Sequence, residues 1–156
     1  MVADIVYEAL VDRLSTTKGD VAVGRTLFTR QACATCHTTA LSEPAKGPYL
    51  GGIFTRYSRA EVLESIMRPA AKVAQGFAAA WFTTTDNRQV AGFVVREGAD
   101  DVVVRDITGA ETTLRKTQIA SRGVSEGSIM PPGLVDTLTL QELASLMAFL
   151  EATTTK

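Results

Sequence analysis

The chain has 156 residues, a formal net charge of −1, 46% hydrophobic residues and 21% charged residues. This composition is typical of one folded globular domain, and the absence of a dense basic face argues against nucleic-acid binding. No apolar run is long enough to span a bilayer, so we expect no membrane insertion, and residues 1–20 lack the pattern of a signal peptide.

Two helices are predicted before the first motif. Apolar residues recur at helical spacing over residues 3–14, which predicts a short amphipathic helix. Asp20 is a suitable N-cap for a second helix, which carries Gly24 and Phe28 and leads directly to Cys33.

The motif Cys33-Ala34-Thr35-Cys36-His37 follows that second helix. Cys-x-x-Cys-His is the signature of c-type haem attachment. Positions three and four apart share a helical face, so both thiols can reach one porphyrin edge while the imidazole points at the iron. His37 is the only histidine, so a second histidine ligand from this chain is excluded. We therefore predict one covalent haem c, attached at Cys33 and Cys36, with His37 as an iron ligand.

Two other interpretations of the cysteine pair remain open but are less favoured. A thioredoxin-like redox pair is expected after a strand, whereas this motif follows a predicted helix. A structural zinc site normally needs four Cys or His ligands, and the chain has three in total. Because both thiols are used by the haem, no disulfide is expected.

The middle of the chain changes from helical to strand periodicity. Residues 38–57 are rich in Gly and Pro and predict a loop. Ser58 and Glu61 form a capping box that begins a third helix, and this helix should end before Pro69.

An antiparallel β meander is predicted over about residues 77–115, in four segments separated by turn residues. The segments are residues 77–85, 89–96, 101–106 and 111–115. We expect an accessory packed sheet with Trp81, Phe93 and Val103 among its buried residues. It contains no Cys, His or Met, so it offers the iron no suitable ligand.

The second axial ligand is expected in the loop before the last helix. Met130 precedes two prolines that stiffen this loop, and Thr139 with Glu142 forms the capping box of the final helix. Met147 lies on the apolar face of that helix, where core packing is the better interpretation. Met130 is therefore the favoured sixth ligand, with Met67 or an open sixth position as alternatives.

Taken in order, these motifs resemble a class I cytochrome c. The resemblance covers most of the chain and rests on the following segments: the helix with Gly24 and Phe28, Cys33 to His37, Gly47-Pro48-Tyr49-Leu50, Met130-Pro131 and the terminal helix. It implies a mainly α fold, with helices around one haem in a single domain of residues 1–156 and the meander as an insertion. It also implies that the Pro48 carbonyl orients His37, and that Gly24 and Phe28 face Leu146 and Leu150.

The meander, Arg56-Tyr57-Ser58-Arg59 and the segment from Ser128 to Leu134 are similar to the Pirellula/Verrucomicrobium-type haem-binding domain. Such domains usually end large exported proteins that resemble sugar or alcohol dehydrogenases. The resemblance therefore implies a periplasmic or otherwise exported location, and a chain that is one part of a longer protein. A redox partner protein or a fused dehydrogenase domain would then exchange electrons with the haem.

The expected function is electron transfer, without enzymatic chemistry. The alternative is a haem-based gas sensor or a peroxidase-like domain, either of which requires an open sixth site. Arg56 or Arg59 is a candidate for neutralising a haem propionate. Lysines are scattered along the chain, so we expect docking through a tethered neighbour rather than strong electrostatic steering.

Overall fold

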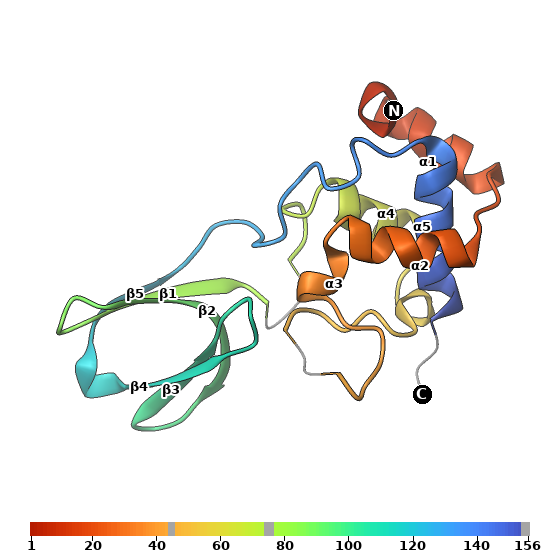
Figure 1. Cartoon of the computed structure of the whole chain (residues 1–156). Helices are drawn as coiled ribbons and strands as arrows, with labels where there is room; N and C mark the ends of the chain where they lie inside the picture. The colour runs from red at the N-terminus through yellow and green to blue at the C-terminus, as the bar shows by residue number, and fades with distance from the viewer. Residues whose placement is uncertain (44–45, 74–76, 154–156) are drawn as a thin grey trace.

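The computed structural model describes residues 1–43, 46–73 and 77–153. It has a helical lobe that contains both ends of the described chain, and a β-sheet lobe beside it (Figure 1). The helical lobe contains α1 (Tyr7–Thr16), α2 (Val21–Arg30), α3 (Cys33–Cys36), α4 (Arg59–Met67), α5 (Leu140–Ala152) and the 3₁₀ turns η1 (Val2–Asp4) and η2 (Ile53–Thr55). The sheet lobe contains β1 (Ala79–Thr84), β2 (Gln89–Glu97), β3 (Asp101–Arg105), β4 (Glu111–Arg115), η3 (Lys116–Gln118) and β5 (Ile119–Val124).

The mainly α prediction describes the helical lobe only. Helices account for 37% of the described residues and strands for 21%, so the chain as a whole is a mixed α and β protein. None of the helices in the described ranges has both the length and the apolar character needed to span a bilayer.

The first helix begins later than predicted. Residues 3–14 were expected to form one helix, but Ile5 is extended and Val6 is not helical, so the two residues separate η1 from α1. Val2 is fully buried, and its N–H donates to the Leu138 carbonyl at 2.8 Å. The apolar residue at position 2 therefore anchors the chain end against the segment that precedes α5.

Helix α2 crosses α5 at very close range. A Cβ atom built on Gly24 would lie 1.9 Å from the Ser145 carbonyl oxygen, so only glycine fits at this crossing. One turn later, the Phe28 ring packs against Phe149 with centroids 5.4 Å apart. The resemblance placed Leu146 and Leu150 opposite Gly24 and Phe28, but the α5 residues nearest to a Cβ atom at Gly24 are Ser145 and Phe149.

Side-chain caps begin three of the helices as predicted. The Asp20 carboxylate accepts from the N–H groups of Ala22 and Val23 at 2.8 and 2.9 Å and begins α2. Ser58 with Glu61 caps α4, and Thr139 with Glu142 caps α5. Such caps satisfy N–H groups that the helix itself leaves free.

Helix α5 forms the centre of the larger core. It is buried on most of its sides, and each large apolar side chain buried there contributes about 1.5–3 kcal/mol. The fully or nearly fully buried residues are Leu143, Leu146, Met147, Phe149 and Leu150. The core prediction for Met147 is thus confirmed.

The sheet is antiparallel with strand order β4-β3-β2-β1-β5. The predicted meander is confirmed for β1 to β4, but the sheet extends beyond residue 115, because β5 returns to pair with β1. Strand β5 is mostly exposed, so it lacks the apolar alternation that would have revealed it in the sequence. A second small core lies inside the curved sheet and consists of Ala80, Phe82, Val102, Val104 and Leu114.

The predicted burial of the sheet residues is correct for Phe93 and Val103 and wrong for Trp81. Phe93 and Val103 are 7% and 6% exposed, whereas Trp81 is 42% exposed. Its neighbours Ala80 and Phe82 point into the core of the sheet, so strand alternation places Trp81 on the outer face. There its ring lies over Gly123, the residue it pairs with on β5.

Candidate haem-attachment site

The two cysteines lie at the ends of the single helical turn α3. Ala32 adopts a left-handed conformation with φ 60°, which ends the path of α2 and begins this turn. Both thiols are free and half-buried, and the N–H of His37 donates to the Cys33 carbonyl at 2.9 Å. Burial raises the pKa of the Cys33 thiol above its usual range. Spacing and fold thus bring both thiols and the imidazole to one turn beside the helical core.

The imidazole of His37 is held by the loop that follows it. Its Nδ1 lies 2.8 Å from the Pro48 carbonyl oxygen, the contact that the resemblance implied. A carbonyl can only accept, so Nδ1 carries the proton and Nε2 keeps a free lone pair. Burial lowers the pKa of His37, although the bond to Pro48 opposes this shift. The ring is therefore prepared to ligate a metal through Nε2.

Gly47 allows the loop to approach closely enough for this contact. A Cβ atom at Gly47 would lie 2.8 Å from the Cys36 carbonyl oxygen, which is too close for any other residue. The loop is also closed by a hydrogen bond of 2.9 Å from the Leu50 N–H to the carbonyl of Thr38, a buried residue. The backbone on both sides of Pro48 is thus fixed relative to α3.

The donor set of this turn does not suit the other interpretations of the cysteine pair. Within the described ranges, no group of three or more Cys, His, Asp or Glu side chains is placed to hold a metal ion, as a zinc site would require. The pair also follows helix α2 rather than a strand, unlike a thioredoxin-like motif.

The family model for cytochrome c matches residues 21–103, which is more than half of the chain. The chain belongs to the cytochrome c family. Proteins of this family carry a covalently bound c-type haem, whose iron serves in electron transfer. The matched range contains α2, α3 and the Pro48 loop, and it ends inside β3. No curated protein matches the chain.

The residues around α3 fit such a haem. Two free thiols and one oriented imidazole are the groups that its attachment requires. In addition, the Tyr49 hydroxyl is buried and has no hydrogen-bond partner among the described residues. An unpaired buried hydroxyl costs about 1–3 kcal/mol, so a polar group of a cofactor reaching Tyr49 would remove this penalty.

Met130, the predicted sixth ligand of the cytochrome, lies on the segment that joins β5 to α5. Its side chain is half-buried, and its backbone N–H donates to the Ser128 hydroxyl at 3.1 Å. The segment after it is firmly anchored, because Val135 and Leu138 are each 1% exposed. The alternative ligand Met67 is partly buried against the helical core, as its place on α4 predicts.

The two candidate arginines differ in their surroundings. Arg56 is exposed, and its guanidinium donates to the Tyr49 carbonyl at 3.0 Å, beside the Pro48 loop. Arg59 forms an ion pair with Glu151 on α5. Arg56 is therefore the one of the two without an acidic partner in the described contacts.

Two features of the site were not predicted from the sequence. Tyr49 was noted as part of the Gly-Pro-x-Leu motif, but its buried hydroxyl gives no signal in the sequence. The contact of Gly47 with Cys36 was also missed, although a glycine before the motif proline is a sign of close backbone approach.

Proposed function

We propose that this cytochrome domain is a single-electron carrier with one haem, attached at Cys33 and Cys36, with His37 and Met130 as axial ligands. The observation that carries the proposal is the bond between His37 Nδ1 and Pro48, next to two free thiols on one turn. When bound, the haem supplies an iron that exchanges one electron between its ferric and ferrous states.

Each residue has a separate part in this proposal. The thioether bonds at Cys33 and Cys36 hold the cofactor independently of its axial ligands. Pro48 fixes the imidazole tautomer and the ring orientation, so Nε2 of His37 stays directed at the iron. The anchored segment after Met130 keeps the thioether sulfur in place, and methionine ligation raises the reduction potential. Arg56 neutralises a propionate.

The same residues favour a carrier over an enzyme. A peroxidase needs a distal acid–base group, and the only histidine of the chain is engaged with Pro48. A gas sensor needs an open or easily vacated sixth position, whereas Met130 precedes two prolines and a buried anchor.

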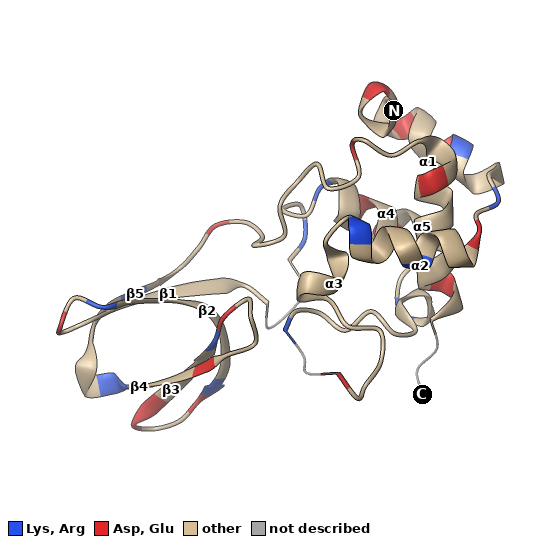
Figure 2. Ribbon diagram, viewed as in Figure 1, with Lys and Arg blue, Asp and Glu red and all other residues tan. Residues whose placement is uncertain are grey.

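For partners, we propose an exported dehydrogenase, fused or separate, as expected for the Pirellula/Verrucomicrobium-type domain in the periplasm. Basic and acidic residues are interspersed over both lobes (Figure 2), which supports docking by a tether over electrostatic steering.

The decisive test is optical spectroscopy of the protein after export with haem-attachment machinery. We expect a red protein whose denatured mass exceeds that of the chain by one haem, and replacement of Cys33 or Cys36 should weaken this attachment. The ferric protein should show near-infrared sulfur-to-iron absorption, and the ferrous protein should not bind carbon monoxide readily. A colourless protein with stoichiometric zinc would exclude haem attachment, and ready binding of carbon monoxide would favour the gas sensor.

A further inference from the structure

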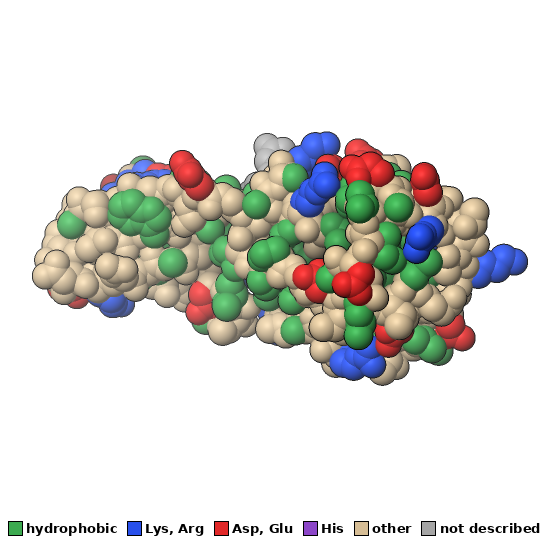
Figure 3. Space-filling model, turned by 90° about the horizontal axis from the view of Figure 1, so that it is seen from above, with side chains coloured by type: hydrophobic (Ala, Val, Ile, Leu, Met, Phe, Trp, Pro, Cys, Tyr) green, Lys and Arg blue, Asp and Glu red, His purple; other side chains and the backbone are tan. Residues whose placement is uncertain are grey.

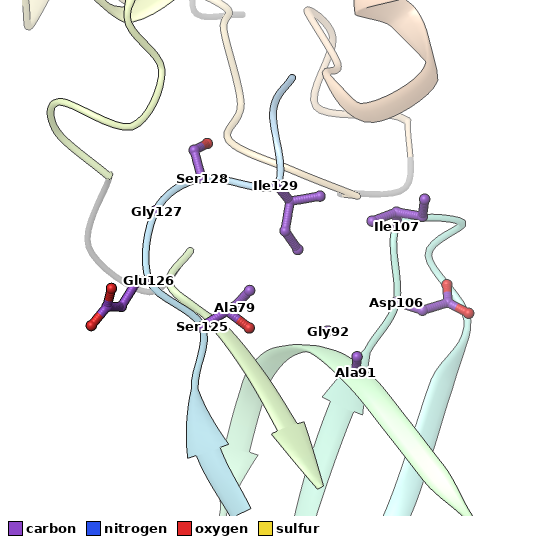
Figure 4. A pocket seen from close by; sticks show the side chains of 10 residues that line it. All are labelled: Ala79, Ala91, Gly92, Asp106, Ile107, Ser125, Glu126, Gly127, Ser128 and Ile129. Atoms are coloured by element: carbon purple, nitrogen blue, oxygen red, sulfur yellow. The ribbon is translucent and has the colours of Figure 1, made fainter. Parts of the chain in front are cut away.

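A hollow of about 320 Å³ lies where the sheet meets the segment that leads to Met130 (Figure 4). Its walls are mostly small residues such as Ala79, Gly92 and Ser125. Asp106 and Glu126 also line it, but their carboxylates point away from the hollow. Two large apolar side chains also line it, Ile107 from the turn between β3 and β4, and Ile129 from the segment between β5 and α5. Both side chains extend into the same space.

Both isoleucines are exposed to solvent. Ile107 is 47% exposed and Ile129 is 37% exposed. Leaving such side chains in water forgoes part of the stabilisation that burial of an isoleucine contributes. Hydrophobic side chains are also visible along the junction of the two lobes when the molecule is seen from above (Figure 3).

The position of this hollow relative to α3 follows from two close contacts. A Cβ atom at Gly109, in the same turn as Ile107, would lie 3.3 Å from Cγ of Lys46. Gly47, the next residue, packs against the Cys36 carbonyl. The turn that carries Ile107 therefore rests on the loop that holds Cys36 and orients His37. On the other wall, Ile129 directly precedes Met130.

We propose that Ile107 and Ile129 form an apolar cover over the haem edge beside Cys36, and that the sheet lobe holds this cover in place. The inference rests on the proposed haem attachment, since the thioether at Cys36 keeps one porphyrin edge next to this residue. The two side chains exclude water from that edge, which disfavours the ferric charge and raises the reduction potential. They also restrict the direct approach of small redox reagents.

The test uses the haem-loaded protein with Ile107→Ser, Ile129→Ser and the double substitution. The matched control is Val95→Ser, because Val95 is a 40% exposed aliphatic residue on β2 that does not line the hollow. Far-UV circular dichroism and the haem absorption confirm folding of each variant. We expect the double variant to have a lower reduction potential and the control to be unchanged.

Reaction rates with small redox reagents distinguish greater exposure of the haem edge from a change in the driving force for electron transfer. A lower potential alone would slow reduction by ascorbate and speed oxidation by ferricyanide, whereas loss of the cover should make both reactions several-fold faster. Ile107→Phe, which enlarges the cover, should slow both the reduction by ascorbate and the oxidation by ferricyanide. Hydrogen–deuterium exchange over residues 127–129 should rise in the double variant.

The inference is wrong if the double variant matches Val95→Ser in potential, in both rates and in exchange. This result is distinguishable from failure of the proposed function. In that second case, the unmodified protein would itself lack covalent haem or the near-infrared sulfur-to-iron absorption.

Discussion

The helical lobe and the sheet lobe are stabilised in different ways. The helical lobe depends on close backbone approach, as at Gly24 against Ser145, and on a core that buries most sides of α5. The sheet encloses five buried core residues and leaves Trp81 and Val124 exposed at 42% and 68%.

The residues that could bind a metal or a haem are also divided unequally between the two lobes. All Cys and His residues lie in the helical lobe, where Cys33 packs against the larger core and His37 is held by Pro48. The cysteines and the histidine thus lie on the closely packed lobe, and the proposal above gives the sheet an accessory part as a cover. The predictions below test this division.

The largest effect is expected from Gly24→Ala. Glycine to alanine in a helix normally gains about 0.5–1 kcal/mol from propensity. At this crossing the added Cβ would collide with the Ser145 carbonyl, and overpacking of this kind costs about 1–3 kcal/mol or more. We expect a net loss of unfolding free energy, measured by chemical denaturation of the helical signal. Val23→Ala, at an exposed position of α2, is the control, and a stability gain in Gly24→Ala would show that the helices do not cross closely.

Met130→Ala tests the ligand on the segment between the lobes. Loss of the thioether should lower the reduction potential, abolish the near-infrared absorption and open the ferrous iron to carbon monoxide. Met67→Leu should change none of the three, because Met67 packs against the helical core. If instead Met67→Leu produced these changes and Met130→Ala did not, the ligand would belong to α4.

Most of the helical lobe was predictable from the sequence because its signals are local, although α1 begins later than predicted and η2 lies within the predicted loop. The Asp20 cap, both capping boxes and the Cys33–His37 motif each lie within a few residues, and the structure places the first three as predicted. Caps and turns can be predicted from closely spaced residues, since caps and turns depend on hydrogen bonds across three or four positions.

What the sequence did not reveal depends on long-range pairing. Strand β5 pairs with β1 across about forty residues, and its exposed face gives no apolar alternation. Trp81 was predicted to be buried, but its neighbours Ala80 and Phe82 point into the core of the sheet, so strand alternation places Trp81 on the outer face. The hollow lined by Ile107 and Ile129 could not be predicted either, because it forms only where the two lobes meet.

Replacing residues 77–124 with a short Gly-Ser linker tests whether the sheet is accessory. Because the sheet has its own core and contains no Cys, His or Met, haem attachment should be retained, measured by the denatured mass. The potential should fall if the cover is lost. Complete loss of attachment with otherwise folded helices would mean that the sheet supports the site directly.

The smallest effect is expected from lowering the pH, which should reduce the stability of the sheet. Glu97 at the end of β2 pairs with Arg122 of β5 at 2.9 Å and with Lys116 at 3.2 Å, which ties together two strands that are not neighbours. The hydrogen bonds from Arg122 first, and then from Lys116, lower the pKa of Glu97 from 4.5 to about 2. A lowered pKa stabilises the fold when the carboxylate is ionised, so this contribution is complete above pH 4.5 and is lost as the pH falls towards 2.

Glu97→Gln removes this contribution at every pH. The stability difference between the unmodified protein and the variant should therefore be largest near neutral pH and should vanish towards pH 2, the folded-state value for Glu97. Trp81 is the only tryptophan and lies on β1, so its fluorescence reports unfolding of the sheet. The pair is exposed, so the effect should be small and should weaken further at high salt. A difference that stays constant from pH 7 to pH 2 would show that Glu97 acts through packing and not through its charge.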